Sequence, residues 1–85
     1  MSYQVVFDPK AKEKLADFDK SVREQIFSRI RKLENDPEHF GKALTGIDLW
    51  VLRAGDYRVM FDLNKNENLV EILRIGHRRN IYDKI

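Results

Sequence analysis

The chain has 85 residues, and 16 Lys or Arg against 14 Asp or Glu leave a net charge of +2. This length predicts a single domain over residues 1–85, with a small core and little stability in reserve. Cysteine is absent and only His39 and His77 could supply imidazole, so we expect no disulfide, no metal and no other cofactor. The start lacks the apolar run of a signal peptide and no stretch is long enough to cross a membrane, which predicts a cytoplasmic protein.

The first half of the chain predicts a strand and two amphipathic helices. After a strand over residues 3–7, Asp8 can cap a helix and Pro9 fits its first position. The second helix starts at one of two caps, Asp19 or a capping box over Ser21–Glu24. The apolar stripes are Ala11, Leu15 and Phe18 on the first helix, and Val22, Ile26, Ile30 and Leu33 on the second. Residues 37–48 are predicted to form a loop with one short turn.

Residues 49–63 predict a β-hairpin that is mostly buried, because eleven of these fifteen residues are apolar, aromatic or glycine. With Ala54-Gly55 as the two-residue loop, Arg53 would face Asp56. Side chains alternate along a strand, so the hairpin has two faces. The uncharged face consists of Trp50, Leu52, Tyr57, Val59, Phe61 and Leu63. The other face consists of Leu49, Val51, Arg53, Asp56, Arg58, Met60 and Asp62.

A further strand over residues 69–75 is predicted to pair with this hairpin. If Asp62 pairs with Val70, Arg58 faces Arg74, and Arg78 continues the same alternation. We predict an α+β fold, in which the N-terminal strand joins a small, mainly antiparallel β-sheet and the helical hairpin packs on its uncharged face. The opposite face is then exposed. Facing arginines destabilise a sheet, so we expect an anion to offset their repulsion.

The end of the chain is basic, with a net charge of +3 over residues 72–85. A basic terminus beside an arginine-bearing sheet face suits a polyanion. The alternative is an ordinary solvated tail, in which Arg78 and Arg79 have no binding role.

Two motifs resemble those of the RelE/ParE superfamily of toxins, and of RelE-type toxins in particular. They are L-R-x-G-x-Y-R-V over Leu52–Val59 and I-G-H-R-x-x-x-Y over Ile75–Tyr82. The resemblance implies the toxin of a type II toxin–antitoxin system, a metal-free endonuclease that cuts mRNA on the ribosome and inhibits translation. The mRNA's own 2′-hydroxyl would attack the adjacent phosphate and leave a 2′,3′-cyclic phosphate. Implied partners are the ribosome, mRNA and a RelB-like antitoxin with an acidic segment.

The resemblance also assigns residues. The implied catalytic residues are Arg58, Arg78 and Tyr82. The expected RNA-binding residues are Arg53, Arg74, Arg79, His77 and Lys42. RelE-type toxins often carry lysines in the strand before the hairpin turn, whereas residues 49–52 contain none, so no general base is assigned. His77 points to the opposite face from Arg58 by alternation, unless the chain turns over beyond Gly76; Lys42 and His39 are the other candidates.

Each residue also has a structural interpretation. Arg58 could pair with Asp56 or Asp62, Arg53 could form a hairpin ion pair with Asp56, and Tyr82 could pack on the core. Two other functions remain open. One is a ParE-type toxin that inhibits DNA gyrase without being an enzyme. The other is a degenerate toxin that only binds its antitoxin.

Overall fold

The computed structural model describes residues 2–84, with side chains described as far as residue 82. In chain order the elements are β1 (Gln4–Phe7), α1 (Pro9–Asp17), α2 (Lys20–Arg31), the 3-10 turn η1 (Lys32–Glu34), α3 (Pro37–Phe40), β2 (Gly41–Ala43), β3 (Trp50–Ala54), β4 (Tyr57–Asn64), β5 (Leu69–His77) and the 3-10 turn η2 (Ile81–Lys84). The strands form one sheet in the order β1-β5-β4-β3-β2, in which β1 is parallel to β5 and the other pairs are antiparallel. The predicted α+β class is confirmed.

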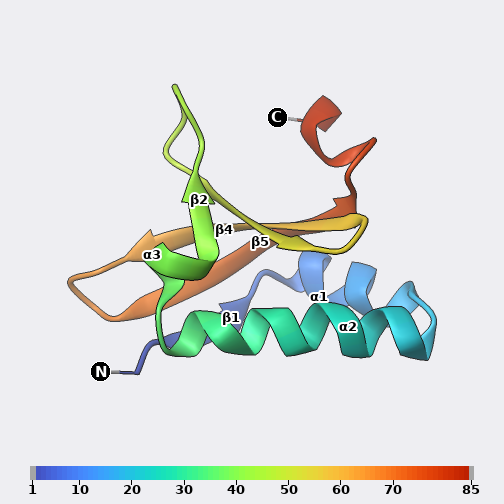
Figure 1. The fold of residues 1–85 in the computed structure, drawn as a ribbon, viewed down its shortest axis with the longest axis horizontal. Coiled ribbons are helices and arrows are strands. Elements are labelled where there is room, and N and C mark those ends of the chain that lie inside the picture. The colour runs from blue at the N-terminus through green and yellow to red at the C-terminus, as the bar shows by residue number, and fades with distance from the viewer. Residues whose placement is uncertain (1, 85) are drawn as a thin grey trace.

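The helices α1 and α2 lie on one side of the sheet, while the β2–β3 loop and η2 rise from the other side (Figure 1). We call the first side the helix face and the second the arginine face. The core lies between the sheet and the helices and includes Ile26, Ile30, Leu33, Leu52, Val59 and Phe61. The predicted packing of both helices on the uncharged face of the hairpin is therefore confirmed. None of the helices in the described part of the chain is long and apolar enough to cross a membrane.

α1 starts after the predicted cap, and α2 starts after Asp19, which is one of its two predicted caps. The Asp8 carboxylate accepts a hydrogen bond from the Lys10 amide at 2.9 Å, and Pro9 occupies the first turn, as predicted. The Ser21 capping box is wrong, because α2 already begins at Lys20 with Asp19 as its N-cap residue. The Asp19 side chain makes no capping hydrogen bond, so packing of the apolar stripe fixes this start.

The hairpin turn consists of Gly55 and Asp56, not of Ala54 and Gly55 as predicted. Gly55 has a φ of +61°, which suits the first central position of a type II′ turn. The turn pairs Ala54 with Tyr57 and Arg53 with Arg58, so the predicted facing of Arg53 and Asp56 is wrong. Pairing partners shift by two positions, which preserves the face of every hairpin residue.

The pairing of β4 with β5 also differs from prediction, because a bulge at Leu73 interrupts it between Met60 and Phe61. Asp62 pairs with Glu71, Met60 with Arg74, and Arg58 with Gly76. The predicted pairs of Asp62 with Val70 and of Arg58 with Arg74 are therefore wrong. The extra residue reverses the alternation of side chains along β5. Val70 and Ile72 therefore belong to the core, whereas the predicted register had placed them on the arginine face.

The segment predicted as a loop after α2 contains two short elements, α3 and β2. The Asp36 carboxylate accepts a hydrogen bond from the His39 amide at 3.1 Å and so caps α3. β2 then pairs with β3, with Lys42 opposite Val51. A β2 of only three residues carries too little periodic signal to be found from the sequence.

Candidate functional site

The arginine face has an apolar floor surrounded by basic residues. Lys42, Val51, Met60 and Arg74 form one row across four strands, because each is the register partner of the next. Val51 and Met60 are buried, whereas Lys42 and Arg74 are exposed. Neighbouring strands lie about 4.8 Å apart, so about 14 Å separates the backbones of the two basic residues.

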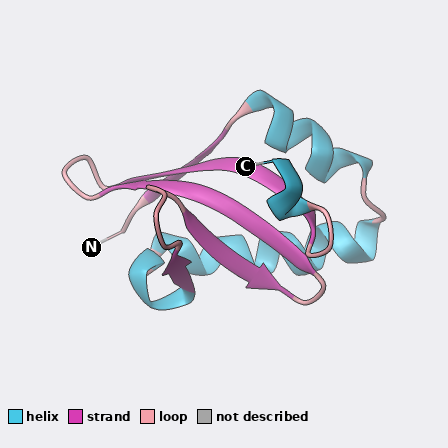
Figure 2. Cartoon of the chain, turned by 90° about the horizontal axis from the view of Figure 1, so that it is seen from above, coloured by secondary structure: helices cyan, strands magenta, loops and turns pink. Residues whose placement is uncertain are grey.

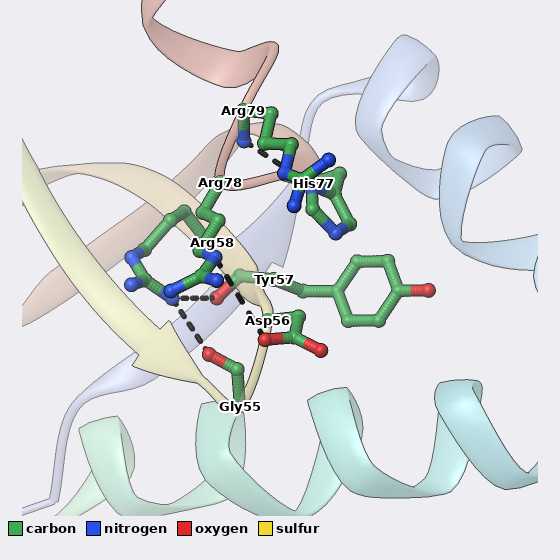
Figure 3. Close-up of polar contacts among 7 residues, drawn as sticks. All are labelled: Gly55, Asp56, Tyr57, Arg58, His77, Arg78 and Arg79. Atoms are coloured by element: carbon green, nitrogen blue, oxygen red, sulfur yellow. Dashed lines mark hydrogen bonds and ion pairs between the residues drawn. The ribbon is translucent and has the colours of Figure 1, made fainter.

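Arg58 lies in the adjacent row and is only 8% exposed, which corrects the prediction of an exposed arginine. Its Nη1 donates hydrogen bonds to the carbonyls of Gly55 and Tyr57, both at 2.8 Å (Figure 3). Among the side chains that the structure describes, no carboxylate lies within 4.0 Å of Arg58, so the alternative of an ion pair with Asp56 or Asp62 is wrong. A buried cation without an anion is costly, unless a ligand supplies the missing charge.

Arg53 is the direct partner of Arg58 across the hairpin. The Arg78 amide donates to the Asp56 carbonyl at 2.8 Å, which makes the Arg53–Arg58 rung a non-hydrogen-bonded pair by alternation. Side chains approach most closely in such a pair, with Cα atoms about 4.5 Å apart. The predicted facing of two arginines is therefore present, with Arg53 in the place of Arg74.

Arg78 joins this pair from the end of β5. Its Nε lies 3.8 Å from the Asp56 carboxylate, and both side chains are more than half exposed, so this contact contributes little to stability. The hairpin turn thus contacts two arginines, Arg58 through the carbonyl of Gly55 and Arg78 through Asp56. The structure brings Arg53, Arg58 and Arg78 together around this turn, and we call these three residues the arginine cluster.

Tyr82 lies in η2, and its side chain is 44% exposed, so the alternative in which it packs on the core is wrong. The residue that anchors this segment is Ile81, which sequence reasoning missed. Its Cδ1 lies 3.2 Å from the position that a Cβ on Gly76 would occupy, and Gly76 is the partner of Arg58. Glycine at this position therefore lets η2 pack down beside the arginine cluster.

His77 lies on the helix face, away from the arginine cluster, as its alternation predicts. Its ring packs edge-on against Tyr57 with centroids 5.6 Å apart, and its Nδ1 accepts a hydrogen bond from the Arg79 amide at 3.2 Å. Figure 3 shows the Tyr57 and Arg58 side chains leaving β4 in opposite directions. Arg79 is exposed in the turn after β5. His39 lies on α3 with its ring against Phe40, outside the sheet.

The arrangement suits an anion held by planar guanidinium groups. Two of the five guanidinium donor hydrogens of Arg58 can serve the carbonyls, which leaves the fork of Nε and Nη2 for an oxyanion. In residues 2–82 no group of three or more His, Asp or Glu is placed to hold a metal ion. The chemistry that these groups offer is charge stabilisation.

Comparison with known proteins identifies the family. A model of the ParE toxin of type II toxin–antitoxin systems (parDE) matches residues 5–82. The chain belongs to this toxin family. The match spans both motifs and the whole arginine cluster, so the predicted membership of the RelE/ParE superfamily is confirmed. Among curated proteins, none matches this toxin significantly.

Solved RelE structures resemble the toxin over nearly its whole length. The RelBE2 toxin–antitoxin complex of Mycobacterium tuberculosis has a chain 25% identical, with a TM-score of 0.84, covering 92% of this chain and 93% of that one. The archaeal RelE–RelB complex of Pyrococcus horikoshii has a chain 28% identical, with a TM-score of 0.75 and coverage of 92% and 97%. The isolated E. coli RelE toxin, at 23% identity with a TM-score of 0.76 and coverage of 98% and 94%, shows the shared fold.

Proposed function

We propose that this toxin is a metal-independent endoribonuclease that cuts mRNA on the ribosome and thereby inhibits translation in the cytoplasm. The observation that carries the proposal is Arg58, a buried guanidinium that faces a second arginine and has no carboxylate partner among the described side chains. A folded chain retains such an arrangement at a cost in stability, which an RNA phosphate would offset.

The proposed reaction uses the RNA as its own nucleophile. The 2′-hydroxyl attacks the adjacent phosphorus, the bond to the 5′ oxygen breaks, and the products are a 2′,3′-cyclic phosphate and a 5′-hydroxyl. The intermediate phosphorane carries more negative charge than the ground state, so a preorganised cation lowers the barrier. Arg58 is suited to this role because two carbonyl hydrogen bonds fix one side of its guanidinium and leave the other side available.

The remaining residues have supporting roles in this proposal. Arg78 adds a second positive charge at the hairpin turn, and exposed Tyr82 offers a ring on which a base can stack. Arg53, Arg74 and Lys42 bind the RNA backbone along the arginine face, and Arg79 contributes to the basic end of β5. His77 lies on the helix face, and we assign it no catalytic step.

A second candidate function is inhibition of DNA gyrase. The family model that matches residues 5–82 is named for ParE, which favours this candidate. The similar solved structures are those of RelE toxins, which favours the ribonuclease. The arginine cluster favours the ribonuclease as well, because a toxin that only binds a protein does not need a buried, unpaired guanidinium. A degenerate toxin that only binds its antitoxin is the third candidate.

Two assays separate the three candidates. One maps the 5′ ends of mRNA on translating ribosomes, with and without the purified toxin, and the other measures the action of DNA gyrase on plasmid DNA. The proposal predicts discrete cuts at the codon in the ribosomal A site, with 5′-hydroxyl ends. Relaxed or cleaved plasmid DNA in a gyrase assay, without mRNA cuts, would establish the gyrase candidate. Absence of both activities would leave antitoxin binding.

We also propose a RelB-like antitoxin as the partner, with an acidic segment that neutralises the arginine cluster. The similar structures from M. tuberculosis and P. horikoshii are both toxin–antitoxin complexes. A complex of this toxin with its antitoxin should therefore lack ribonuclease activity, and the acidic segment should contact Arg58 and Arg78. An inactive complex in which the antitoxin contacts neither arginine would contradict direct masking.

A further inference from the structure

A tight turn links the end of β5 to η2, and each of its amides has a hydrogen-bond acceptor. The Asn80 amide donates to the His77 carbonyl at 2.9 Å, as in a β-turn. The Arg78 amide donates to the Asp56 carbonyl at 2.8 Å. The Arg79 amide donates to His77 Nδ1 at 3.2 Å (Figure 3). Two of the three acceptors therefore belong to His77, one to its backbone and one to its side chain.

The imidazole of His77 takes the place that an Asn or Asp side chain has in an Asx-turn. In such a turn a side-chain oxygen bonded to Cγ accepts a hydrogen bond from the amide two residues along the chain. Nδ1 is likewise bonded to Cγ, and Arg79 is two residues beyond His77. A ring nitrogen that accepts a hydrogen bond carries no hydrogen, so the ring hydrogen lies on Nε2. His77 is thus an uncharged acceptor in this arrangement.

Packing on the helix face holds the His77 ring in place. His77 and Tyr57 are register partners, and their rings meet edge-on with centroids 5.6 Å apart and an interplanar angle of 80°. Tyr57 also packs edge-on against Phe18, with centroids 5.1 Å apart. Such edge-to-face contacts favour one orientation of each ring. The Tyr57 carbonyl accepts a hydrogen bond from Arg58, so Tyr57 supports both the turn and the arginine cluster.

The turn determines where two residues of the candidate site lie. Arg78, a member of the arginine cluster, is part of the turn, and Tyr82 follows it in η2. Seen from above the arginine face, η2 lies over the sheet at the end of β5 (Figure 2). Ile81 is buried there beside Gly76, whereas Tyr82 is exposed. A shift of the turn would therefore move Arg78 and Tyr82 relative to Arg58, which β4 holds.

We propose that His77 is a positioning residue that fixes the turn after β5 and so places Arg78 and Tyr82 for RNA cleavage. This inference rests on the proposed ribonuclease function and gives a role to a residue that has no step in it. Direct proton transfer by His77 does not suit the geometry, because its ring lies on the helix face and the Arg58 side chain leaves β4 on the other. Placement matters for the rate, because a small displacement of a group that contacts the substrate slows the reaction strongly.

Three variants of His77 separate its hydrogen-bond acceptor from its ring. His77→Asn loses the ring but keeps an oxygen bonded to Cγ, where Nδ1 is now. His77→Phe keeps an aromatic ring against Tyr57 but has no acceptor. His77→Gln is the matched control for His77→Asn, because it carries the same amide group one carbon further from the backbone, away from the position of Nδ1.

The test measures single-turnover cleavage on programmed ribosomes, hydrogen exchange of the Arg79 amide and thermal unfolding. His77→Asn should cleave within about threefold of the unchanged toxin, whereas His77→Phe and His77→Gln should cleave about tenfold more slowly or worse. The Arg79 amide should exchange about fivefold faster in the last two variants, because it has lost its acceptor. His77→Phe should nevertheless unfold at a higher temperature than His77→Asn, because it retains the contact with Tyr57.

The proposal is overturned if His77→Phe cleaves like the unchanged toxin, or if the cleavage rates follow the unfolding temperatures of the variants. A rate of His77→Asn as low as that of His77→Phe would also overturn it and would indicate proton transfer by the imidazole, which an amide cannot replace. Exchange and unfolding do not depend on cleavage. If the unchanged toxin cuts no mRNA, the ribonuclease proposal fails by itself, and equal exchange of the Arg79 amide in all variants would still overturn the positioning role.

Discussion

The two faces of the sheet are built from the same strands, but they differ in the side chains that they bury. The helix face is continuous and apolar, and Leu52, Val59 and Phe61 are fully buried there against α2. The arginine face also buries residues, namely Val51 and Met60, but it places a guanidinium beside them. The helix face accounts for folding by apolar burial alone. The arginine face carries a cation whose burial opposes folding, which indicates that function maintains it.

The largest effect on stability should come from the helix face. Phe61 is fully buried and stacks on Trp50 with centroids 6.2 Å apart. Phe61→Ala leaves a cavity and should lower the free energy of unfolding by about 3–5 kcal/mol. Urea denaturation measures this loss, with Phe27→Ala at a 47% exposed position as the control. Equal losses in the two variants would show that the core does not lie where the structure has it.

The next largest effect is expected at the hairpin turn, where Gly55 lies near Gln25 of α2 and its carbonyl accepts a hydrogen bond from Arg58. Gly55 has a φ of +61°, and an added Cβ would meet the amide of Gln25 on α2. Gly55→Ala should cost roughly 1–2 kcal/mol of stability from the left-handed backbone. It should also lower cleavage at least tenfold, because it shifts a carbonyl that holds Arg58.

Gly46→Ala is the matched control for the turn. Gly46 has a φ of +80°, but an added Cβ would meet nothing within 4 Å. Thermal unfolding and initial cleavage rates should show a similar loss of stability and an unchanged rate. A parallel loss of rate in both variants would remove the turn from the site.

Some of the features on which these predictions rest could be predicted from the sequence, and others could not. The cap at Asp8, the helical stripes and the faces of the hairpin follow from periods of 3.6 and 2 residues, which are local properties. The register of the hairpin does not follow from these local periods. Gly55 fits either central position of a two-residue turn, and only the strand pairing of the folded protein selects the first. The bulge at Leu73 depends on long-range pairing with β4 and reverses the face of half a strand.

The candidate site was predictable in composition but not in geometry. Arg58 and Arg78 are present in the family motifs, whereas the burial of Arg58 depends on the carbonyls of Gly55 and Tyr57, which no side-chain pattern encodes. The pairing of Arg53 with Arg58 could not be predicted, because the expected register paired Arg53 with Asp56. Tertiary pairing thus converts an expected ion pair into a repulsive one.

Removal of the Arg53 side chain should have a smaller effect, and it distinguishes repulsion between Arg53 and Arg58 from binding of RNA by Arg53. Arg53→Ala removes the charge that faces Arg58, so stability should stay constant or rise by about 0.2–1 kcal/mol. Affinity for a single-stranded RNA should fall, because one phosphate contact is lost. Thermal unfolding and RNA titration at fixed salt concentration measure the two quantities. A destabilised Arg53→Ala would mean that the arginines stabilise each other.

Removal of metal ions is expected to have no effect on cleavage. The proposed reaction needs no metal, so chelation should leave the cleavage rate unchanged when the ribosomes remain intact. The measurement compares rates with and without EDTA after exchange of the toxin into metal-free buffer. Loss of cleavage that zinc or manganese specifically restores would contradict the metal-free mechanism.

The most direct measurement is the single-turnover cleavage rate of Arg58→Ala on programmed ribosomes, with ribosome binding measured in parallel. Loss of one charge-assisted contact to the transition state should lower the rate by about 10²–10³, with binding little changed. Arg58→Lys should recover only part of the rate, because an ammonium lacks the planar fork. Lys12→Ala on α1 should cleave like the unchanged toxin. Cleavage by a folded Arg58→Ala at nearly the original rate would contradict the role of Arg58 in the reaction.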